Sequence, residues 1–254
     1  RQMCIRDRLN TWSCDMREEL LRTASLIGEN GIDKLSHSAA AVFGIGGVGS
    51  YVAEALVRSG LGTLYIYDND TVAKSNINRQ LIALNSTVGK NKTDIAAARY
   101  RDINPECNII PVCEFITPES EIPFEKFGVM IDAVDNVTAK LFLAEQAYKR
   151  KIHLISVMGT GNKTDPTRIR VTDISKTSVC PLARVMRCEL KKRGVSGITA
   201  VWSDEPPIKP QDCGEYRSTG RVSPASMAPV PGAAGLTAAA EAIKRLISAN
   251  PGSF

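Results

Sequence analysis

The sequence has no long apolar run, which bears first on a membrane role. Hydrophobic residues make up 43% of the 254 residues, yet no stretch approaches the roughly 20 consecutive apolar residues that a spanning helix needs. Several charges open the chain, and no apolar segment follows them, so the sequence shows no secretory signal. These absences predict a protein with no membrane partner.

Paired cysteines are also missing. The seven cysteines are an odd number, and no two have the C-x-x-C spacing of a structural zinc site. Such scattered cysteines are equally unlike a disulfide framework, so a reducing, cytoplasmic location is predicted. The two histidines, His37 and His153, belong to no metal-ligand pattern and are interpreted as structural.

Charge of either sign is not in large excess. The net charge of +5 permits a polyanionic partner without requiring one. Residues 1–15 show no periodicity, and we expect a disordered tail there. Residues 16–254 are predicted to form a single domain, with a core at 36–158 and a substrate-binding part at 159–254.

Short apolar runs alternate with helical patterns along the core. Strands are predicted at 39–44, 63–67, 108–113, 129–133 and 153–157. Helices are predicted at 16–35 with a break around Gly28 and Gly31, and at 50–59, 92–103 and 138–149. This alternation predicts an α/β, Rossmann-like, doubly wound and mainly parallel sheet.

The C-terminal part has a different character and is expected to extend this sheet. Strand patterns at 168–174 and 198–202 flank a cationic helix at 181–193. A long loop rich in Pro, Gly and Ser is predicted at 204–231, followed by a helix at 235–247.

A glycine-rich motif lies between the first strand and the next helix. Gly44, Gly46 and Gly49 have the G-x-G-x-x-G spacing, with Gly47 inside it, and this context suits a phosphate at a helix N-terminus. Asp68 follows the next strand, where a carboxylate can bind ribose hydroxyls. One alternative is a tight turn that binds no ligand. The other is an NAD site, which the glycine motif and Asp68 alone would suggest as readily as an ATP site.

Further charges favour a triphosphate over NAD. Asp70, the Asn76-x-x-Arg79-Gln80 segment and Lys92 follow Asp68 in the chain. Attack at the α-phosphorus of ATP builds up negative charge, which cations and magnesium must offset. The alternative for Arg79 and Lys92 is a set of surface salt bridges.

Asp135 and Asn136 follow another predicted strand. Because the carboxyl ends of parallel strands meet at one edge, we expect them near Asp68 and the glycine motif. A carboxylate there suits magnesium, whose preferred ligands are oxygens. The alternative is that Asp135 or Asn136 only caps the following helix.

Taken together, these motifs resemble the adenylating signature of the ThiF/MoeB/HesA superfamily, which is similar to ubiquitin-activating enzymes. The resemblance runs from about Arg22 to Val157. It implies that Asp68 binds ribose, that Asp135 holds magnesium, and that Arg22 reaches into the site of a neighbouring protomer in a homodimer. The implied catalytic residues are Arg22, Arg79, Lys92 and Asp135. The implied ATP-binding residues are Gly44, Gly46, Gly47, Gly49, Asp68, Asp70, Asn76, Arg79, Gln80, Lys92 and Asn136.

The C-terminal part narrows the resemblance. Residues 159–168, 176–187 and 205–210 resemble the bacterial tRNA threonylcarbamoyladenosine dehydratases. That resemblance implies an enzyme that adenylates the threonyl carboxylate of threonylcarbamoyladenosine in tRNA with ATP and then cyclises it. It also implies tRNA as a partner and allows a sulfur-transfer protein.

The cationic helix is the candidate tRNA surface. Arg184, Arg187 and Lys191 recur at helical spacing, so one face could meet a phosphate backbone. The alternative is an ordinary solvated face, and no interleaved aromatics suggest base stacking. Cys180 is a candidate thiol for a thioester, but we favour a buried structural role.

Three other functions are considered. The first is activation of a ubiquitin-like sulfur-carrier protein at its C-terminus, the second an NAD-dependent dehydrogenase, and the third a tRNA-binding module without catalysis. Pyrophosphate exchange that depends on tRNA rather than on a carrier protein would distinguish the first. A comparison of ATP with NAD binding would test the second, and absence of ATP turnover would indicate the third.

Overall fold

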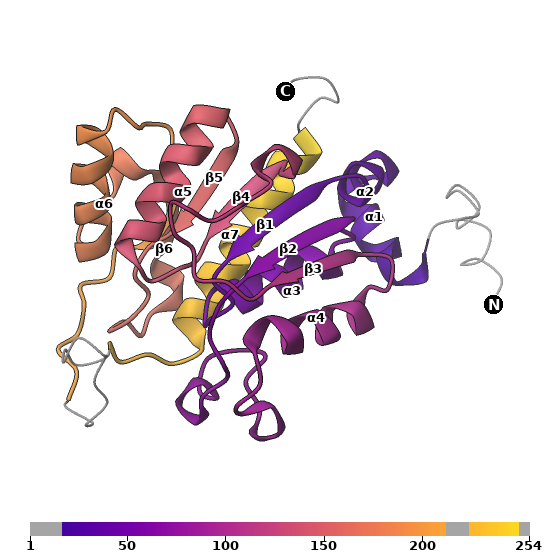
Figure 1. Cartoon of the computed structure of the whole chain (residues 1–254), viewed down its shortest axis with the longest axis horizontal. Coiled ribbons are helices and arrows are strands. Elements are labelled where there is room, and N and C mark those ends of the chain that lie inside the picture. The colour runs from indigo at the N-terminus through magenta and orange to yellow at the C-terminus, as the bar shows by residue number, and fades with distance from the viewer. Residues whose placement is uncertain (1–16, 212–223, 249–254) are drawn as a thin grey trace, which may run out of the picture.

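The computed structural model describes residues 17–211 and 224–248, so the tail predicted at 1–15 lies outside the described residues (Figure 1). Its strands are β1 Ala39–Phe43, β2 Thr63–Tyr67, β3 Asn108–Val112, β4 Val129–Asp132, β5 His153–Val157, β6 Ile169–Asp173 and β7 Thr199–Ser203. Its α-helices are α1 Leu21–Ile27, α2 Glu29–Ser36, α3 Gly49–Arg58, α4 Lys92–Ile103, α5 Val137–Arg150, α6 Pro181–Lys192 and α7 Pro229–Ser248.

All these strands belong to one seven-stranded sheet in the order β3-β2-β1-β4-β5-β7-β6. Every neighbouring pair is parallel except β6 and β7, which are antiparallel. The chain moves outward from β1 to β3 and then returns to the other side of β1 with β4. Ligands of such sheets bind at this reversal, beyond the carboxyl ends of the strands. The predicted doubly wound, mainly parallel fold is confirmed.

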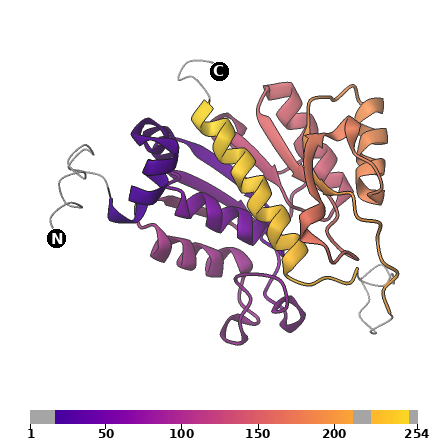
Figure 2. The ribbon, with the colours of Figure 1, turned by 180° about the vertical axis from the view of Figure 1, so that it is seen from behind.

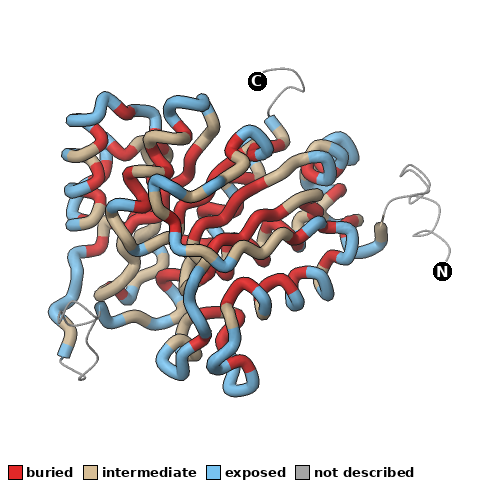
Figure 3. Tube along the Cα trace, viewed as in Figure 1, coloured by how far each residue is buried: buried red, intermediate tan, exposed pale blue. Residues whose placement is uncertain are grey.

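Helices cover both faces of the sheet. α3, α4 and α7 pack on one face, where α7 runs across the sheet (Figure 2). α5 and α6 pack on the other face. The central strands are buried on both sides (Figure 3), which explains why they are continuous apolar runs rather than alternating patterns.

Two predicted boundaries are wrong. α7 begins at Pro229, six residues before the predicted helix and inside the predicted 204–231 loop, of which 212–223 lies outside the described residues. Proline is tolerated in the first turn of a helix because no intrahelical partner awaits its missing N–H. Near the N-terminus, the break lies at Gly28 alone, with φ of 77°, and Gly31 lies within α2.

Across 17–211 and 224–248, no helix is both long and apolar enough to cross a membrane.

Candidate functional site

The glycine motif forms a tight turn between β1 and α3 that only glycine allows at two positions. Gly44 has φ of 87°, and a Cβ there would lie 2.9 Å from the carbonyl oxygen of Ala133 in the loop after β4. A Cβ on Gly49 would lie 1.8 Å from the carbonyl oxygen of Gly44. The turn therefore brings bare backbone and the N-terminus of α3 to the carboxyl edge of the sheet, as a phosphate site requires.

Asp68 holds this turn in place. Its Oδ2 accepts a hydrogen bond from the amide of Ile45 at 2.7 Å, and its Oδ1 accepts one from the amide of Asp70 at 2.8 Å. Burial raises the pKa of the Asp68 carboxyl, and the nearby Lys92 ammonium opposes that rise. Each oxygen keeps a second lone pair, so the contact with ribose stays a prediction.

Lys92 lies beside both aspartates. Its Nζ is 2.7 Å from Oδ2 of Asp70 and 3.9 Å from Oδ1 of Asp68. Only 6% of the Lys92 side chain is exposed, whereas 61% of the Asp70 side chain is. The ammonium is therefore held at the mouth of the turn, and the salt bridge considered from sequence is present at the same place.

The segment between Asp70 and Lys92 brings Arg79 and Gln80 to the turn. The aliphatic stem of Arg79 packs over Gly47, where a Cβ would lie 3.3 Å from Cγ of the arginine. Its guanidinium donates to the carbonyl oxygen of Ser75 and to Oδ1 of Asn78. Gln80 is buried beside Gly46, and its Oε1 has no hydrogen-bond partner among the described residues. Arg79 and Gln80 therefore lie against the glycine turn, and their contact with phosphates stays a prediction.

Asn76 has a local structural role as well as its predicted one. Its Oδ1 accepts a hydrogen bond from the amide of Ala73 at 3.1 Å, and its carbonyl oxygen accepts from the amides of Arg79 and Gln80. Asn76 therefore shapes the turn that carries Arg79. Ser50 adds a link that the sequence did not reveal, because its hydroxyl accepts from the amide of Leu81 and donates to the carbonyl oxygen of Gly46.

The loop between β4 and α5 carries the predicted magnesium residue. Asp135 is exposed in this loop at the carboxyl edge of the sheet. Asn136 is the N-cap of α5, and its Oδ1 accepts from the amides of Thr138 and Ala139. Helix capping, the alternative considered from sequence, thus accounts for the Asn136 oxygen, and its contact with ATP stays a prediction.

The described residues contain no group of three or more His, Cys, Asp or Glu side chains that could hold a metal ion. Magnesium often takes one or two protein carboxylates together with substrate phosphates rather than a cage of protein ligands. A single carboxylate beside a phosphate-binding turn fits that pattern.

Arg22 lies at the other edge of the sheet. It is exposed on α1, which leads through α2 to the beginning of β1, whereas the glycine turn follows the end of β1 (Figure 1). Leu26, one turn further along α1, is 85% exposed. Arg22 therefore does not join the site of its own chain, and the predicted role requires a second protomer.

The cationic helix α6 does not present all its predicted residues equally. Arg187 donates to the carbonyl oxygen and hydroxyl of Thr177, so its guanidinium anchors the preceding turn. Arg184 and Lys191 are exposed. Lys192 pairs with Glu189 at 2.7 Å. The face available to a phosphate backbone is therefore narrower than the sequence predicts.

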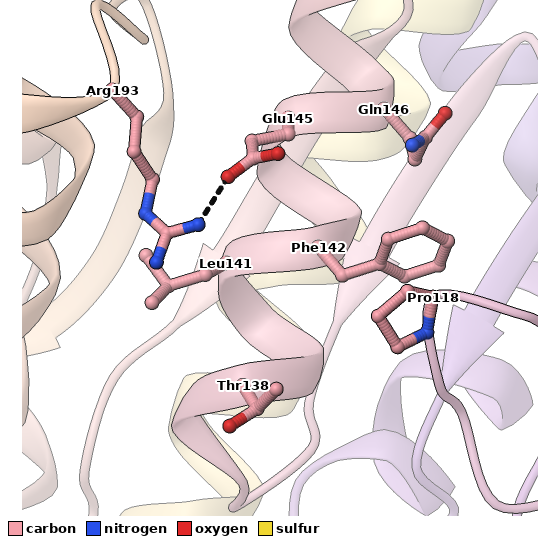
Figure 4. Close-up of a pocket in the computed structure, with 7 residues that line it drawn as sticks. All are labelled: Pro118, Thr138, Leu141, Phe142, Glu145, Gln146 and Arg193. Carbon is pink, nitrogen blue, oxygen red and sulfur yellow. Dashed lines mark hydrogen bonds and ion pairs between the residues drawn. The ribbon is translucent and has the colours of Figure 1, made fainter.

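A hollow on α5 lies away from these residues. It has a volume of about 260 Å³ and lies between α5, the segment after β3 and the end of α6 (Figure 4). Phe142 and Pro118 line one side, and the ion pair between Glu145 and Arg193 lies on the other. None of the predicted site residues lines it.

Asn162 holds the segment before α7, and that segment in turn contacts the site. Sequence reasoning missed this link. Its φ is 60°, in the left-handed region that Asn tolerates better than most residues. It exchanges hydrogen bonds with the backbone of Ala225 at 2.7 and 2.8 Å, and its carbonyl accepts from the amide of Ile208. The next residue, Ser226, accepts from Asn78 beside Arg79. The Gly-Asn sequence after β5 was the available signal.

The comparisons with known proteins agree with this arrangement. The model of the ThiF family matches residues 19–254. The chain belongs to the ThiF family. It is 42% identical over 196 residues to the tRNA threonylcarbamoyladenosine dehydratase of Bacillus subtilis (strain 168). The matched residues cover 76% of this chain and 77% of that relative. It is 39% identical over 208 residues to the Escherichia coli (strain K12) protein of the same name, covering 78% of each.

A solved structure of this ThiF-family group holds a nucleotide. The structure of Escherichia coli tRNA N6-threonylcarbamoyladenosine dehydratase, TcdA, in complex with ATP matches with a TM-score of 0.83 and 34% identity. The match covers 91% of this chain and 95% of that one. The resemblance stated from the sequence motifs is confirmed, both for the ThiF family and for its dehydratases.

Proposed function

We propose that this ThiF-family chain is an ATP-dependent tRNA threonylcarbamoyladenosine dehydratase. The observation that carries the proposal is the convergence of the glycine turn, Arg79, Lys92 and the Asp135 loop at one edge of the sheet. The named relatives and the ATP-bound dehydratase support this function and the use of ATP.

The chemistry follows from the poor reactivity of a carboxylate. An oxygen of the threonyl carboxylate attacks the α-phosphorus of ATP, the bond to the β-phosphate oxygen breaks, and pyrophosphate leaves. A nitrogen or oxygen of the same threonylcarbamoyl group then attacks the activated carbonyl carbon, AMP leaves with its oxygen, and an N–H of the group gives up one proton. The product has lost one water, and the ring closure is intramolecular, so its entropic cost is small.

The residues of the site divide this work. The backbone of the glycine turn and the N-terminus of α3 would bind phosphates. Arg79 and Lys92 would stabilise the charge that builds up at the α-phosphorus. Asp135 would hold magnesium, which when bound offsets charge on the phosphates.

The remaining predicted partners are part of the proposal. Arg22 is exposed at the opposite edge of the sheet from the glycine turn, so it could complete a site only in another protomer of a homodimer; the alternative is an ordinary exposed helix arginine. tRNA is the substrate that the dehydratase function requires, and Arg184 and Lys191 are its candidate contacts. A cytoplasmic location and a sulfur-transfer protein remain predictions.

The alternative of a thioester on Cys180 has less support. Cys180 is 2% exposed and packs near Gly159, where a Cβ would lie 3.8 Å from its sulfur. A nucleophilic thiol needs access and a thiolate. The intramolecular cyclisation needs no enzyme thiol.

The experiment is mass analysis of tRNA nucleosides after incubation with the protein. With ATP and tRNA that carries threonylcarbamoyladenosine, the modified nucleoside should lose the mass of one water. Omitting ATP, or replacing it with NAD, should leave the nucleoside unchanged. Pyrophosphate exchange that required a ubiquitin-like carrier protein and ignored tRNA would instead support the sulfur-carrier alternative.

A further inference from the structure

A fully buried ion pair lies directly behind the Asp135 loop. Asp132 is the last residue of β4, and Lys140 is in the first turns of α5. Nζ of Lys140 is 2.9 Å from Oδ2 of Asp132, and both side chains have 0% exposure. Neither residue belongs to the predicted ATP-binding set.

The ammonium of Lys140 makes a complete set of contacts. It donates to Asp132, to the carbonyl oxygen of Val157 at 2.7 Å and to the hydroxyl of Ser156 at 3.4 Å. A lysine ammonium has three N–H donors, so all three have acceptors here. Ser156 in turn donates to Oδ2 of Asp132 at 2.6 Å. The pair therefore joins the carboxyl ends of β4 and β5 to α5.

The acid of this pair also contacts the loop that carries Asp135. Oδ1 of Asp132 accepts from the amide of Val134 at 3.2 Å, while beyond Asp135 the first backbone hydrogen bond of α5 runs from the amide of Lys140 to the carbonyl oxygen of Asn136 at 3.0 Å. On the opposite side, the amide of Ala133 donates to the carbonyl oxygen of Phe43 just before the glycine turn. The residues around Asp135 are thus fixed between the ion pair and the glycine turn.

Stability alone does not explain such a pair. Removing two charges from water is costly, and well-packed apolar residues of similar volume often stabilise a core as well or better. What the charges add is geometry, because their directed contacts fix the ends of β4 and β5 to α5, and Asp132 then holds the loop at the amide of Val134. We propose that Lys140 is a positioning residue that acts through Asp132 to place the Asp135 carboxylate for magnesium-bound ATP.

This inference rests on the proposed role of Asp135. The main variant is Asp132→Leu with Lys140→Met, which removes both charges together and leaves neither group buried without a partner charge. A second variant, Asp132→Asn with Lys140→Met, keeps the oxygen that the Val134 amide contacts. Glu54→Gln is the matched control, since Glu54 is a buried acid paired with Arg58 and Arg99 on α3 and α4.

Binding is measured with Mn²⁺ as the probe, titrated into the full-length protein with ATP and followed by electron paramagnetic resonance. Loss of groups that orient a metal ligand commonly weakens metal binding by about 10–100-fold. We expect a loss in this range for the Leu/Met variant, a smaller loss for the Asn/Met variant, and no change for Glu54→Gln. Thermal unfolding of each variant reports whether the fold is kept.

Two results would overturn the proposal: unchanged Mn²⁺ affinity in a folded Leu/Met variant, or an equal loss in Glu54→Gln. Asp135→Ala tests the underlying role separately. If Asp135→Ala bound Mn²⁺ with ATP as well as the unchanged protein, the magnesium site would be wrong and the positioning role would fall with it. Absence of tRNA dehydration would reject the proposed function, while the Mn²⁺ titration would still decide the positioning role.

Discussion

Replacing Lys92 with methionine tests the electrostatic basis of the proposed function. Methionine keeps most of the length of the lysine side chain and removes its charge. Because the Lys92 side chain is 6% exposed and its ammonium is held 2.7 Å from Asp70, the charge is preorganised rather than mobile at the surface. Losing one such group at a developing charge costs about 2.7–4 kcal/mol of transition-state stabilisation, or roughly 10²–10³-fold in kcat.

The effect on stability should come mainly from Asp68, whose side chain is 9% exposed and lies 3.9 Å from the Lys92 ammonium. The Asp70 side chain is 61% exposed, and ion pairs with an exposed partner contribute about 0–1 kcal/mol. The Asp68 carboxyl should respond differently, because Lys92 opposes the rise that burial causes in its pKa. Without Lys92 the pKa of Asp68 should rise further, and the acid limb of the activity profile should move to higher pH.

The assay is tRNA-dependent exchange of pyrophosphate into ATP at saturating ATP and magnesium. Lys74→Met is the matched control, since Lys74 is an exposed lysine in the same connection between β2 and α4. A loss of about tenfold or less for Lys92→Met, or an equal loss for Lys74→Met, would refute direct stabilisation of the phosphates by Lys92.

Three further predictions concern the turn, the tRNA surface and pH. Gly49→Ala places a Cβ 1.8 Å from a backbone oxygen, so we expect a loss of about 1–3 kcal/mol in unfolding free energy and weaker ATP binding. Neutralising Arg184 and Lys191 should reduce the salt slope of tRNA binding by about 1 per charge. Burial lowers the pKa of His153 below its usual 6.5. The stability that the neutral, buried imidazole contributes should therefore be fully present above pH 6.5, and it should be lost as the pH drops through the lowered pKa.

Each of these predictions has an outcome that would contradict it. In calorimetry, Gly46→Ala, where a Cβ meets only a side-chain atom at 3.8 Å, should lose less unfolding free energy than Gly49→Ala, and an equal loss would contradict the steric argument. An unchanged salt slope in the Arg184 and Lys191 variant would place the tRNA elsewhere. His153→Gln should flatten the pH dependence of denaturant unfolding, and an unchanged dependence would show that burial of His153 is not its cause.

The sheet could be predicted from the sequence because burial on both faces leaves a simple pattern. β1 and β2 are apolar runs followed by Gly44 and Asp68, and β4 is an apolar run that ends at Asp132, so both the strands and the edge of the sheet at which they end could be predicted. The beginning of α7 was hidden because its first residues are proline and glycine, which elsewhere indicate loops.

The reason for those glycines is tertiary. A Cβ on Gly235 would lie 2.5 Å from the carbonyl oxygen of Val48, and one on Gly232 would lie 3.4 Å from the ring of Tyr51. The glycines let α7 lie close against α3. Local patterns contain no information about a helix that arrives from the other end of the chain, so this boundary required the structure.

The site shows the same division between local and long-range information. Residue types and spacing predicted that the glycine turn, Arg79 and Lys92 surround a triphosphate, and the structure brings these residues to one edge of the sheet. The partners of these residues were not visible. Arg187 bonds to Thr177, whereas Arg184 and Lys191 on the same helix remain exposed, a difference that helical spacing could not show.

Those partners bear on how the site could catalyse a reaction. The Lys92 ammonium is fixed by Asp70, Arg79 is fixed by neutral oxygens of its own turn, and the turn itself is fixed by Asp68. Charges whose positions are set by the fold need little reorganisation when charge develops on a phosphate, and this is where electrostatic catalysis gains most of its advantage. Behind them, the positioning role proposed for Lys140 and Asp132 applies the same principle to the Asp135 loop, where the desolvation of two charges would be offset by a fixed position for the carboxylate.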